Sequence, residues 1–163
     1  MTLDLITVKP VLTVEEFESA TELAYQSNKR LHEQNRHDLR YAKLSEARDL
    51  TDYMKGEGVI WLATSNKSPL GYSMGTTKID KKSDFMIDWV FAADAAKHKG
   101  VGTNLVQTME RHAKEKGYEN IVSYITKDNL ISQSMMKKCG FSLSFGLDKF
   151  YLKDEFYAKK SLK

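Results

Sequence analysis

The chain has only one cysteine, two prolines and no long apolar run. A single cysteine excludes an internal disulfide framework and is typical of proteins kept in a reducing compartment. No apolar stretch approaches the ~18 residues that a membrane-spanning helix needs. The first residues also lack the basic start and long apolar core of a signal peptide. We therefore expect a cytoplasmic protein with no membrane partner.

An excess of one charge is missing as well. Lysine and arginine number 25 against 22 aspartates and glutamates, and the resulting charge of +3 is too small to indicate a nucleic-acid partner. No Ser/Gly-rich tract marks a linker, and 163 residues suffice for one core. We expect residues 1–163 to form a single domain. The sequence does not determine the oligomeric state, and a homodimer is one candidate.

The apolar patterns predict an α/β (strictly α+β) architecture with about seven strands. Strands are expected near residues 3–8, 59–63, 70–79, 84–92, 120–125, 141–145 and 149–152. Helices are expected from about Val14 to Asn28 or beyond, from an N-cap at Ser45 to Gly56, from Val101 to Gly117, and after Asn129. Thr13 and Glu16 form a capping box before the first helix. Residues 159–163 are predicted to be a frayed tail.

A glycine loop stands between the strand 84–92 and the helix that follows it. The loop reads Lys-His-Lys-Gly-Val-Gly-Thr-Asn over residues 97–104. Glycines allow backbone N–H groups to approach a bulky anion, and the start of a helix favours negative charge. The segment is neither a Walker loop nor a dinucleotide fingerprint. It therefore predicts either a phosphate site or a simple strand–helix turn.

A second stretch, Asn129-Leu-Ile-Ser-Gln-Ser-Met-Met-Lys-Lys-Cys-Gly-Phe141, begins 27 residues after Gly102. The loop resembles the Gln/Arg-x-x-Gly-x-Gly/Ala loop of the GCN5-related N-acetyltransferases, the GNAT family. The second stretch is similar to the family's Asn-x-x-Ala-x-x-x-Tyr-x-x-x-Gly-Phe helix. Three positions depart from the family: Lys97 replaces Gln or Arg, Ser132 replaces Ala, and Met136 replaces Tyr. The two patterns at this separation identify the chain as a member of the family.

The resemblance implies a mixed, mostly antiparallel seven-stranded sheet with helices on both faces, whose two central parallel strands splay apart. It also implies acetyl-CoA as the cosubstrate and no metal. Asn129 should reach the pantetheine arm, although an N-cap of the last helix is an alternative role. The remaining cofactor-binding residues implied are the strand edge Val90, Phe91 and Ala92, and the loop residues Lys97, His98, Lys99, Gly100, Val101, Gly102 and Thr103.

Two side chains are candidates for the catalytic base or for orienting the amine. Asp88 interrupts an apolar strand, which a buried ion pair or an exposed edge would also explain. Tyr124 precedes Asn129 by five residues, where some family members carry a glutamate base, and a core or cleft aromatic is the alternative. Met136 stands where the family has the tyrosine that protonates the leaving thiolate, and a thioether cannot donate a proton.

Residues 32–44 are polar and aperiodic, and the resemblance implies an acceptor-facing lip there, with Tyr72 on a facing strand. A solvated connection is the alternative. His32 and His37 have no cysteine nearby, so we predict no metal site. Cys139 lies on the apolar side of the last helix and is predicted to be a buried structural thiol.

The sequence therefore predicts an acetyl-CoA-dependent N-acetyltransferase that acts on a primary amine of a small molecule or peptide by direct transfer. The alternative is an acyl-CoA-binding protein of the same fold with weak or no catalysis, and the absence of a tyrosine at Met136 favours it. The acceptor amine and the preferred acyl chain remain open, since one fold serves many acceptors.

Overall fold

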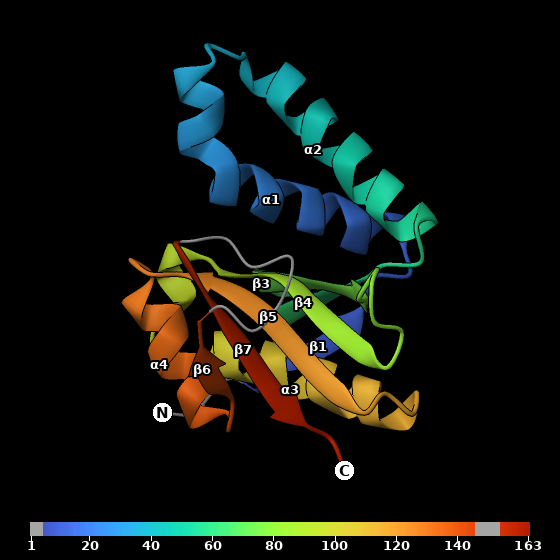
Figure 1. The fold of residues 1–163 in the computed structure, drawn as a ribbon. Coiled ribbons are helices and arrows are strands. Elements are labelled where there is room, and N and C mark those ends of the chain that lie inside the picture. The colour runs from blue at the N-terminus through green and yellow to red at the C-terminus, as the bar shows by residue number, and fades with distance from the viewer. Residues whose placement is uncertain (1–4, 146–153) are drawn as a thin grey trace. The chain divides into compact units, whose positions relative to one another are not determined.

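The structure is a computed structural model of the chain, and it describes residues 5–145 and 154–163. The strands are β1 (Thr7–Pro10), β2 (Val59–Ser65), β3 (Ser68–Thr77), β4 (Asp84–Ala92), β5 (Asn120–Thr126), β6 (Ser142–Ser144) and β7 (Glu155–Ser161) (Figure 1). The helices are α1 (Val14–Gln34), α2 (Leu39–Lys55), the 3-10 turn η1 (Asp94–Ala96), α3 (Val101–Glu115) and α4 (Leu130–Lys138).

The seven strands form one mixed sheet in the order β1-β2-β3-β4-β5-β7-β6. The central pair β4–β5 is parallel, as the connection through α3 predicts, and the pairs β1–β2, β5–β7 and β6–β7 are antiparallel. The parallel register runs from Asp84 opposite Asn120 to Ile87 opposite Ser123. Both strands continue beyond this register, β4 to Ala92 and β5 to Thr126. The predicted fold class is confirmed.

The chain divides into two compact units by its internal packing. The first unit holds residues up to Met74 together with Trp89–Leu105, and the second holds Gly75–Asp88 and Val106–Lys163. The prediction that residues 1–163 form one domain stays a prediction. In the part of the chain that the structure describes, no helix combines the length and apolar character needed to cross a membrane.

Within the first unit, α1 and α2 are adjacent helices that share an apolar core with β2 and β3. α1 begins at the predicted capping box, in which Thr13 accepts from the Glu16 N–H and the Glu16 carboxylate accepts from the Thr13 N–H. The core cluster consists of Val11, Ala20, Leu23, Ala24, Leu50, Ile60, Leu62 and Tyr72. Burial of these side chains holds the α1–α2 pair on this part of the sheet.

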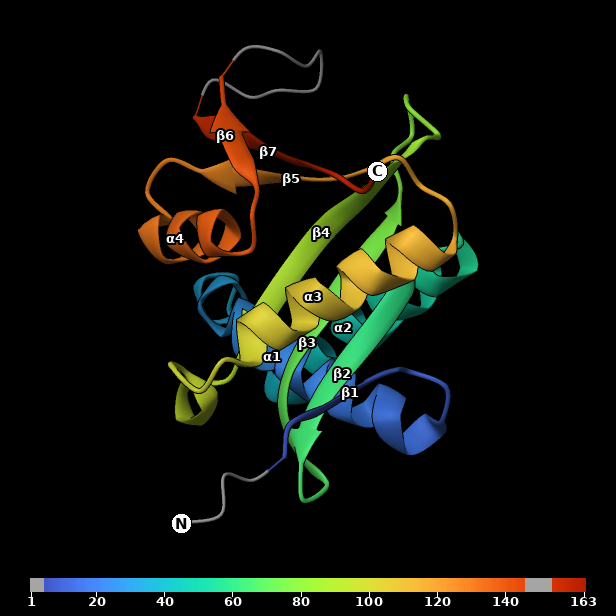
Figure 2. The same cartoon turned by 90° about the horizontal axis from the view of Figure 1, so that it is seen from below.

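Within the second unit, β5 pairs along its whole length with β7, and α4 leads into β6 (Figure 2). Met109, Ala113, Ile121, Val122 and Ala158 are fully buried. Cys139 ends α4 and is buried, and burial raises the pKa of its thiol. The predicted structural role of this cysteine therefore agrees with its surroundings.

The predicted start of the second helix was wrong. α2 begins at Leu39 rather than at Ser45, because the Asp38 side chain accepts a hydrogen bond from the Tyr41 N–H and caps the helix. The sequence pattern did not reveal this start, because the first turns of α2 have no buried apolar stripe. The two leucines there, Leu39 and Leu44, are both exposed to solvent. Residues 32–44, predicted to be aperiodic, are therefore mostly helical.

Pro10 is the last residue of β1, in agreement with its inability to continue the hydrogen-bond ladder of a sheet. The C-terminal end of the chain differs from the prediction. Residues 159–161 of the predicted frayed tail belong to strand β7 (Glu155–Ser161), and the Lys160 ammonium lies 2.8 Å from a Glu110 carboxylate oxygen. The predicted strand 149–152 and its connection at Gly146 lie outside the described residues.

Candidate functional site

The glycine loop of the first unit joins the end of β4 to the N-terminus of α3 (Figure 2). His98 and Gly100 have left-handed backbones with φ of 64° and 79°, a region that suits glycine. The Gly100 carbonyl accepts from the Asn104 N–H at 2.9 Å, so Gly100 stands immediately before the first helical turn. The N–H groups of Val101, Gly102 and Thr103 open that turn and have no carbonyl partner within the helix. This arrangement can receive an anion.

Two lysines of the loop add positive charge. The Lys97 ammonium lies 2.6 Å from a carboxylate oxygen of Asp94, and this hydrogen bond lowers the pKa of Asp94. Both side chains are exposed, so solvent screens the pair and Lys97 can exchange this partner for a phosphate. Lys99 is exposed as well. The loop thus carries two cations beside the free N–H groups of α3.

The end of β4 lies very close to β3. A Cβ on Gly71 would meet the Phe91 carbonyl oxygen at 2.4 Å and a Val101 methyl at 2.9 Å. Only glycine therefore lets β3 approach the backbone of Phe91 so closely. Val90, Phe91 and Ala92 are all half-buried, and the register with β5 has ended before them. The predicted cofactor edge is thus a strand segment beyond the β4–β5 ladder.

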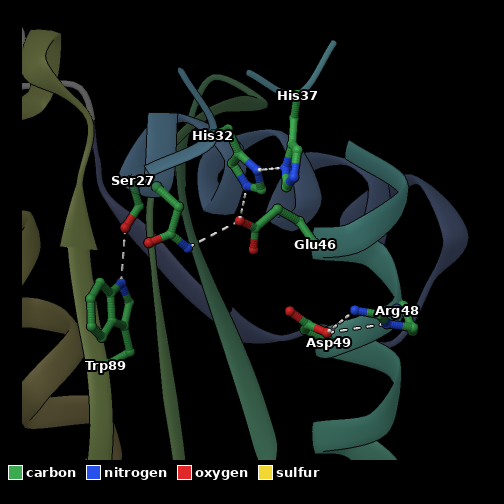
Figure 3. Close-up of polar contacts among 8 residues, drawn as sticks. Ser27, His32, His37, Glu46, Arg48, Asp49 and Trp89 are labelled. Atoms are coloured by element: carbon green, nitrogen blue, oxygen red, sulfur yellow. Dashed lines mark hydrogen bonds and ion pairs between the residues drawn. The ribbon is translucent and has the colours of Figure 1, made fainter. Parts of the chain in front are cut away.

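The indole of Trp89 is tied to α1. Its Nε1–H donates to Ser27 Oγ at 3.1 Å, and the side chain remains 44% exposed (Figure 3). Tyr72 is buried instead of facing an acceptor, and burial raises the pKa of its hydroxyl. A hydrogen bond with Ser27 opposes that shift, and the charge of Glu46 adds to it. The predicted role of Tyr72 in a lip therefore reduces to packing and to its contact with Ser27.

A polar cluster that the sequence did not predict links α1, residues 35–38 and α2. Glu46 Oε1 lies 2.6 Å from His32 Nε2 and accepts from Asn28 Nδ2 at 3.1 Å. His32 Nδ1 lies 3.1 Å from His37 Nδ1 (Figure 3). His32 and Glu46 are both buried. One feature of the sequence could have indicated this cluster: His32 and Glu46 stand at inward-facing positions of their two helices. The polar character of residues 32–44 instead favours a solvated segment.

The two catalytic candidates lie on neighbouring strands. Asp88 is exposed on β4, which favours the exposed edge over the buried ion pair as its structural explanation. Tyr124 is half-buried on β5, with its ring 5.5 Å from that of Tyr157 and 5.6 Å from the Lys78 ammonium. Lys78 itself is buried. The buried carboxylate of β4 is Asp84, whose burial no sequence pattern predicts.

The last helix carries the remaining candidates. Asn129 caps α4, since its side-chain oxygen accepts from the Ser132 N–H at 3.0 Å. Its side chain is exposed, so the amide NH2 group can still donate to a ligand. Met136 is buried, with 2% of its surface exposed. The N-cap alternative for Asn129 is thus confirmed, and a second role is compatible with it.

The comparisons with known proteins agree with this geometry. The sequence matches the family model described as the acetyltransferase (GNAT) family over residues 20–141. The chain belongs to the GNAT family. The chain is also 24% identical over 94 residues to the protein named Probable N-acetyltransferase 14 of Xenopus tropicalis. That match covers 58% of the chain and 46% of the relative, so the chain spans less than half of the curated protein's length.

Solved structures share the fold of this GNAT chain. An N-acetyltransferase from Staphylococcus aureus Mu50 aligns with a TM-score of 0.75 at 16% identity, over 98% of this chain and 99% of that one. The paia N-acetyltransferase from Thermoplasma acidophilum, in complex with coenzyme A, aligns with a TM-score of 0.72 at 18% identity over 96% and 99%. The yncA protein of Salmonella typhimurium, with its cofactor acetyl-CoA, gives 0.71 at 15% over 97% and 94%.

Proposed function

We propose that the chain is an acetyl-CoA-dependent N-acetyltransferase that transfers an acetyl group directly to a primary amine of a small molecule or peptide. The observation that carries the proposal is the left-handed Gly100 followed by the free N–H groups at the start of α3. Family membership and the relatives solved with coenzyme A or acetyl-CoA support it. The ligand of this loop is then the pyrophosphate of acetyl-CoA.

Each proposed cofactor contact follows from the chemistry of its residue. Val101, Gly102 and Thr103 would donate backbone N–H groups to phosphate oxygens, and Lys97 and Lys99 would neutralise their charge. The backbone of Val90, Phe91 and Ala92 would pair with the pantetheine amides, and the Asn129 amide would donate to the same arm. His98 contributes the left-handed backbone that turns the loop.

Gly102→Val should abolish acetyl-CoA binding, because its branched side chain occupies the space that phosphate oxygens need beside the helix start. Isothermal titration calorimetry with acetyl-CoA measures this, with circular dichroism to show that the variant is folded. Gly56→Ala is the control, since Gly56 ends α2 and an added Cβ there would meet nothing closer than 3.5 Å. A folded Gly102→Val protein with wild-type affinity would show that the loop does not bind phosphate.

The transfer step needs a neutral amine, an oxyanion donor and a departing thiol. An amine with a pKa of ~10.4 costs roughly 4–5 kcal/mol to deprotonate at pH 7. Asp88 is the proposed base, acting directly or through water, and Tyr124 would orient the amine or relay its proton. A backbone N–H near Val90 would hold the oxyanion. The thiolate of coenzyme A, with a thiol pKa of ~8.5, leaves without an acid at a cost of ~2 kcal/mol at most.

Because deprotonating the amine costs more than releasing the thiolate, three variants should differ in turnover in a definite order. Asp88→Asn should lower turnover most, Tyr124→Phe should have an intermediate effect, and Met136→Tyr should raise turnover about tenfold or less. Because Met136 is buried, the larger side chain will also lower stability, and turnover must be normalised to folded protein. The measurement is steady-state thiol release with one active acceptor across pH 6 to 9. Full turnover of both Asp88→Asn and Tyr124→Phe would mean that neither residue is the base.

The second candidate function is a non-catalytic acyl-CoA-binding protein, and the buried thioether of Met136 at the position of the family's acid favours it. A thiol-release assay with acetyl-CoA and a broad panel of small and peptide amines separates the two. Acetyl-CoA binding together with no release above background for any amine would support the second candidate.

A further inference from the structure

Lys78 is a buried lysine that the proposed transfer step does not use. It directly follows β3 in the second unit, and only 2% of its surface is exposed. Its backbone N–H donates to the Asp84 carbonyl oxygen at 2.9 Å, which ties it to the first residue of β4. Lysines are almost never fully buried unless their charge is paired. The groups around the ammonium therefore indicate what this residue does.

Two tyrosine rings and a carboxylate lie around the Lys78 ammonium. Its Nζ is 5.0 Å from the ring centroid of Tyr157 and 5.6 Å from that of Tyr124. It is also 3.7 Å from a carboxylate oxygen of Asp80, whose side chain is mostly buried. Both ring distances lie within the ~6 Å range of cation–π attraction, which is stronger where water is excluded. One buried cation thus holds two rings at once.

The two rings also contact each other. Tyr124 and Tyr157 stand opposite each other in the antiparallel pair of β5 and β7 (Figure 1). Their centroids are 5.5 Å apart, and aromatic side chains paired across two strands stabilise each other. Tyr157 is buried whereas Tyr124 is half-buried, so Tyr124 is the ring that a ligand can reach. Lys78 and Tyr157 support it from the buried side.

We propose that Lys78 is a positioning residue, which together with Tyr157 holds the Tyr124 ring in the orientation that acetyl transfer needs. The inference rests on the proposed function, in which Tyr124 orients the amine or relays its proton. A hydroxyl does either only within hydrogen-bond reach of its partner, and a misplacement of about 1 Å can cost about a hundredfold in rate. Lys78 acts through Tyr124 and not on the reacting atoms.

A double-mutant cycle in turnover tests the proposal, with Lys78→Met and Tyr124→Phe made singly and together. Methionine keeps the unbranched chain of lysine and removes its charge, and replacing a buried ion by an apolar group often leaves a fold intact. Lys78→Met should lower kcat about threefold to tenfold and leave the KM for acetyl-CoA unchanged. In the Tyr124→Phe background it should lower kcat no further, because the hydroxyl that it positions is already gone.

Lys127→Met is the matched control and should leave turnover unchanged. Lys127 also lies over an aromatic ring, that of Phe145 at 5.4 Å, but its side chain is 44% exposed. Turnover is measured as thiol release with an amine that the acceptor panel shows to be active. If circular dichroism shows that Lys78→Met is unfolded, Lys78→Gln takes its place in the cycle.

NMR of the chain with ¹³C-labelled tyrosine rings reads the ring position without activity. Tyr124→Phe identifies the Tyr124 signal among the eight tyrosines. Lys78→Met should move this signal more than Lys127→Met does. No acetyl transfer to any amine would overturn the proposed function and the catalytic role of Tyr124 together, even if the signal moves. Transfer by the wild-type chain with equal losses of kcat from Lys78→Met in both backgrounds, or an unmoved Tyr124 signal, would overturn the positioning role alone.

Discussion

Gly71 is a residue whose replacement by any larger side chain must move the backbone of a neighbouring strand. Its missing side chain lets β3 pass the Phe91 carbonyl, which a Cβ would meet at 2.4 Å. Backbone atoms cannot yield as a flexible side chain can, so the strand must shift to accept a methyl group. This contact involves the strand segment that we propose to hold the cofactor. A substitution at Gly71 should therefore change both the stability of the fold and the affinity for the cofactor.

Gly71→Ala should lower the free energy of unfolding by about 1–3 kcal/mol, the usual cost of inserting a methyl group into a closely packed site. It should also weaken acetyl-CoA binding, since the Phe91 backbone must move. Urea unfolding and calorimetry measure the two effects. Gly56→Ala again serves as the control, because its surroundings accept a Cβ at 3.5 Å. If Gly71→Ala unfolds with the same free energy as the wild-type chain, β3 and β4 can move apart at this point without loss of stability, which would contradict the prediction.

At the scale of the element, α2 shows that its first residues are specified by a cap and not by an apolar stripe. Asp38 accepts from the Tyr41 N–H at 2.9 Å, whereas Leu39, Tyr41 and Leu44 are all more than half exposed. The side chains that do face inward are Ala42, Glu46 and Leu50. A helix that buries few large apolar groups at its start depends more on its cap.

Asp38→Ala should therefore cost about 1 kcal/mol of stability, the typical value for losing an aspartate N-cap. Ser45→Ala is the matched comparison, because Ser45 lies inside α2 and alanine is the better helix former there, so its effect should be close to zero. Urea unfolding of both variants measures the difference. An equal or larger loss in Ser45→Ala would place the start of the helix at Ser45.

At the scale of the whole molecule, the sequence predicted most of the fold because local patterns and family motifs agree with each other. The strand 84–92, the glycine loop and the helix after it lie where they were expected, and the parallel pairing of β4 with β5 was predicted as well. What could not be predicted depends on partners far apart in the chain. Glu46 is buried only because His32 and Asn28 meet it from another helix.

The same reason explains why the C-terminus differs from its prediction. Residues 155–161 alternate weakly, and the two lysines at 159–160 suggest a solvated tail. Lys160 is nevertheless held in β7 because its ammonium donates to Glu110 Oε2 and to the Cys139 carbonyl oxygen, both at 2.8 Å. Partners 50 and 21 residues away satisfy this charge, and no local pattern records them.

This contact between α3, α4 and β7 makes the stability of the second unit depend on pH. Burial raises the pKa of Glu110, but the hydrogen bonds and charges of Lys160 and Lys114 lower it more, so its net shift is downward from 4.5. A carboxyl with a lowered folded-state pKa is more easily deprotonated in the native state. Its stabilisation is fully present above pH 4.5 and disappears as the pH falls through the folded-state pKa.

Glu110→Gln should therefore be less stable than the wild-type chain at pH 7, and the gap should narrow as the pH falls from about 5 to 3. The measurement is urea unfolding at a series of pH values. Glu119→Gln is the control, because Glu119 forms an exposed pair with Lys163 at 3.0 Å and such pairs contribute little. A gap between Glu110→Gln and wild type that stays constant over this range would show that the Glu110 carboxylate does not stabilise the native state through its charge. The loss at pH 7 would then come from altered packing between α3 and β7 alone.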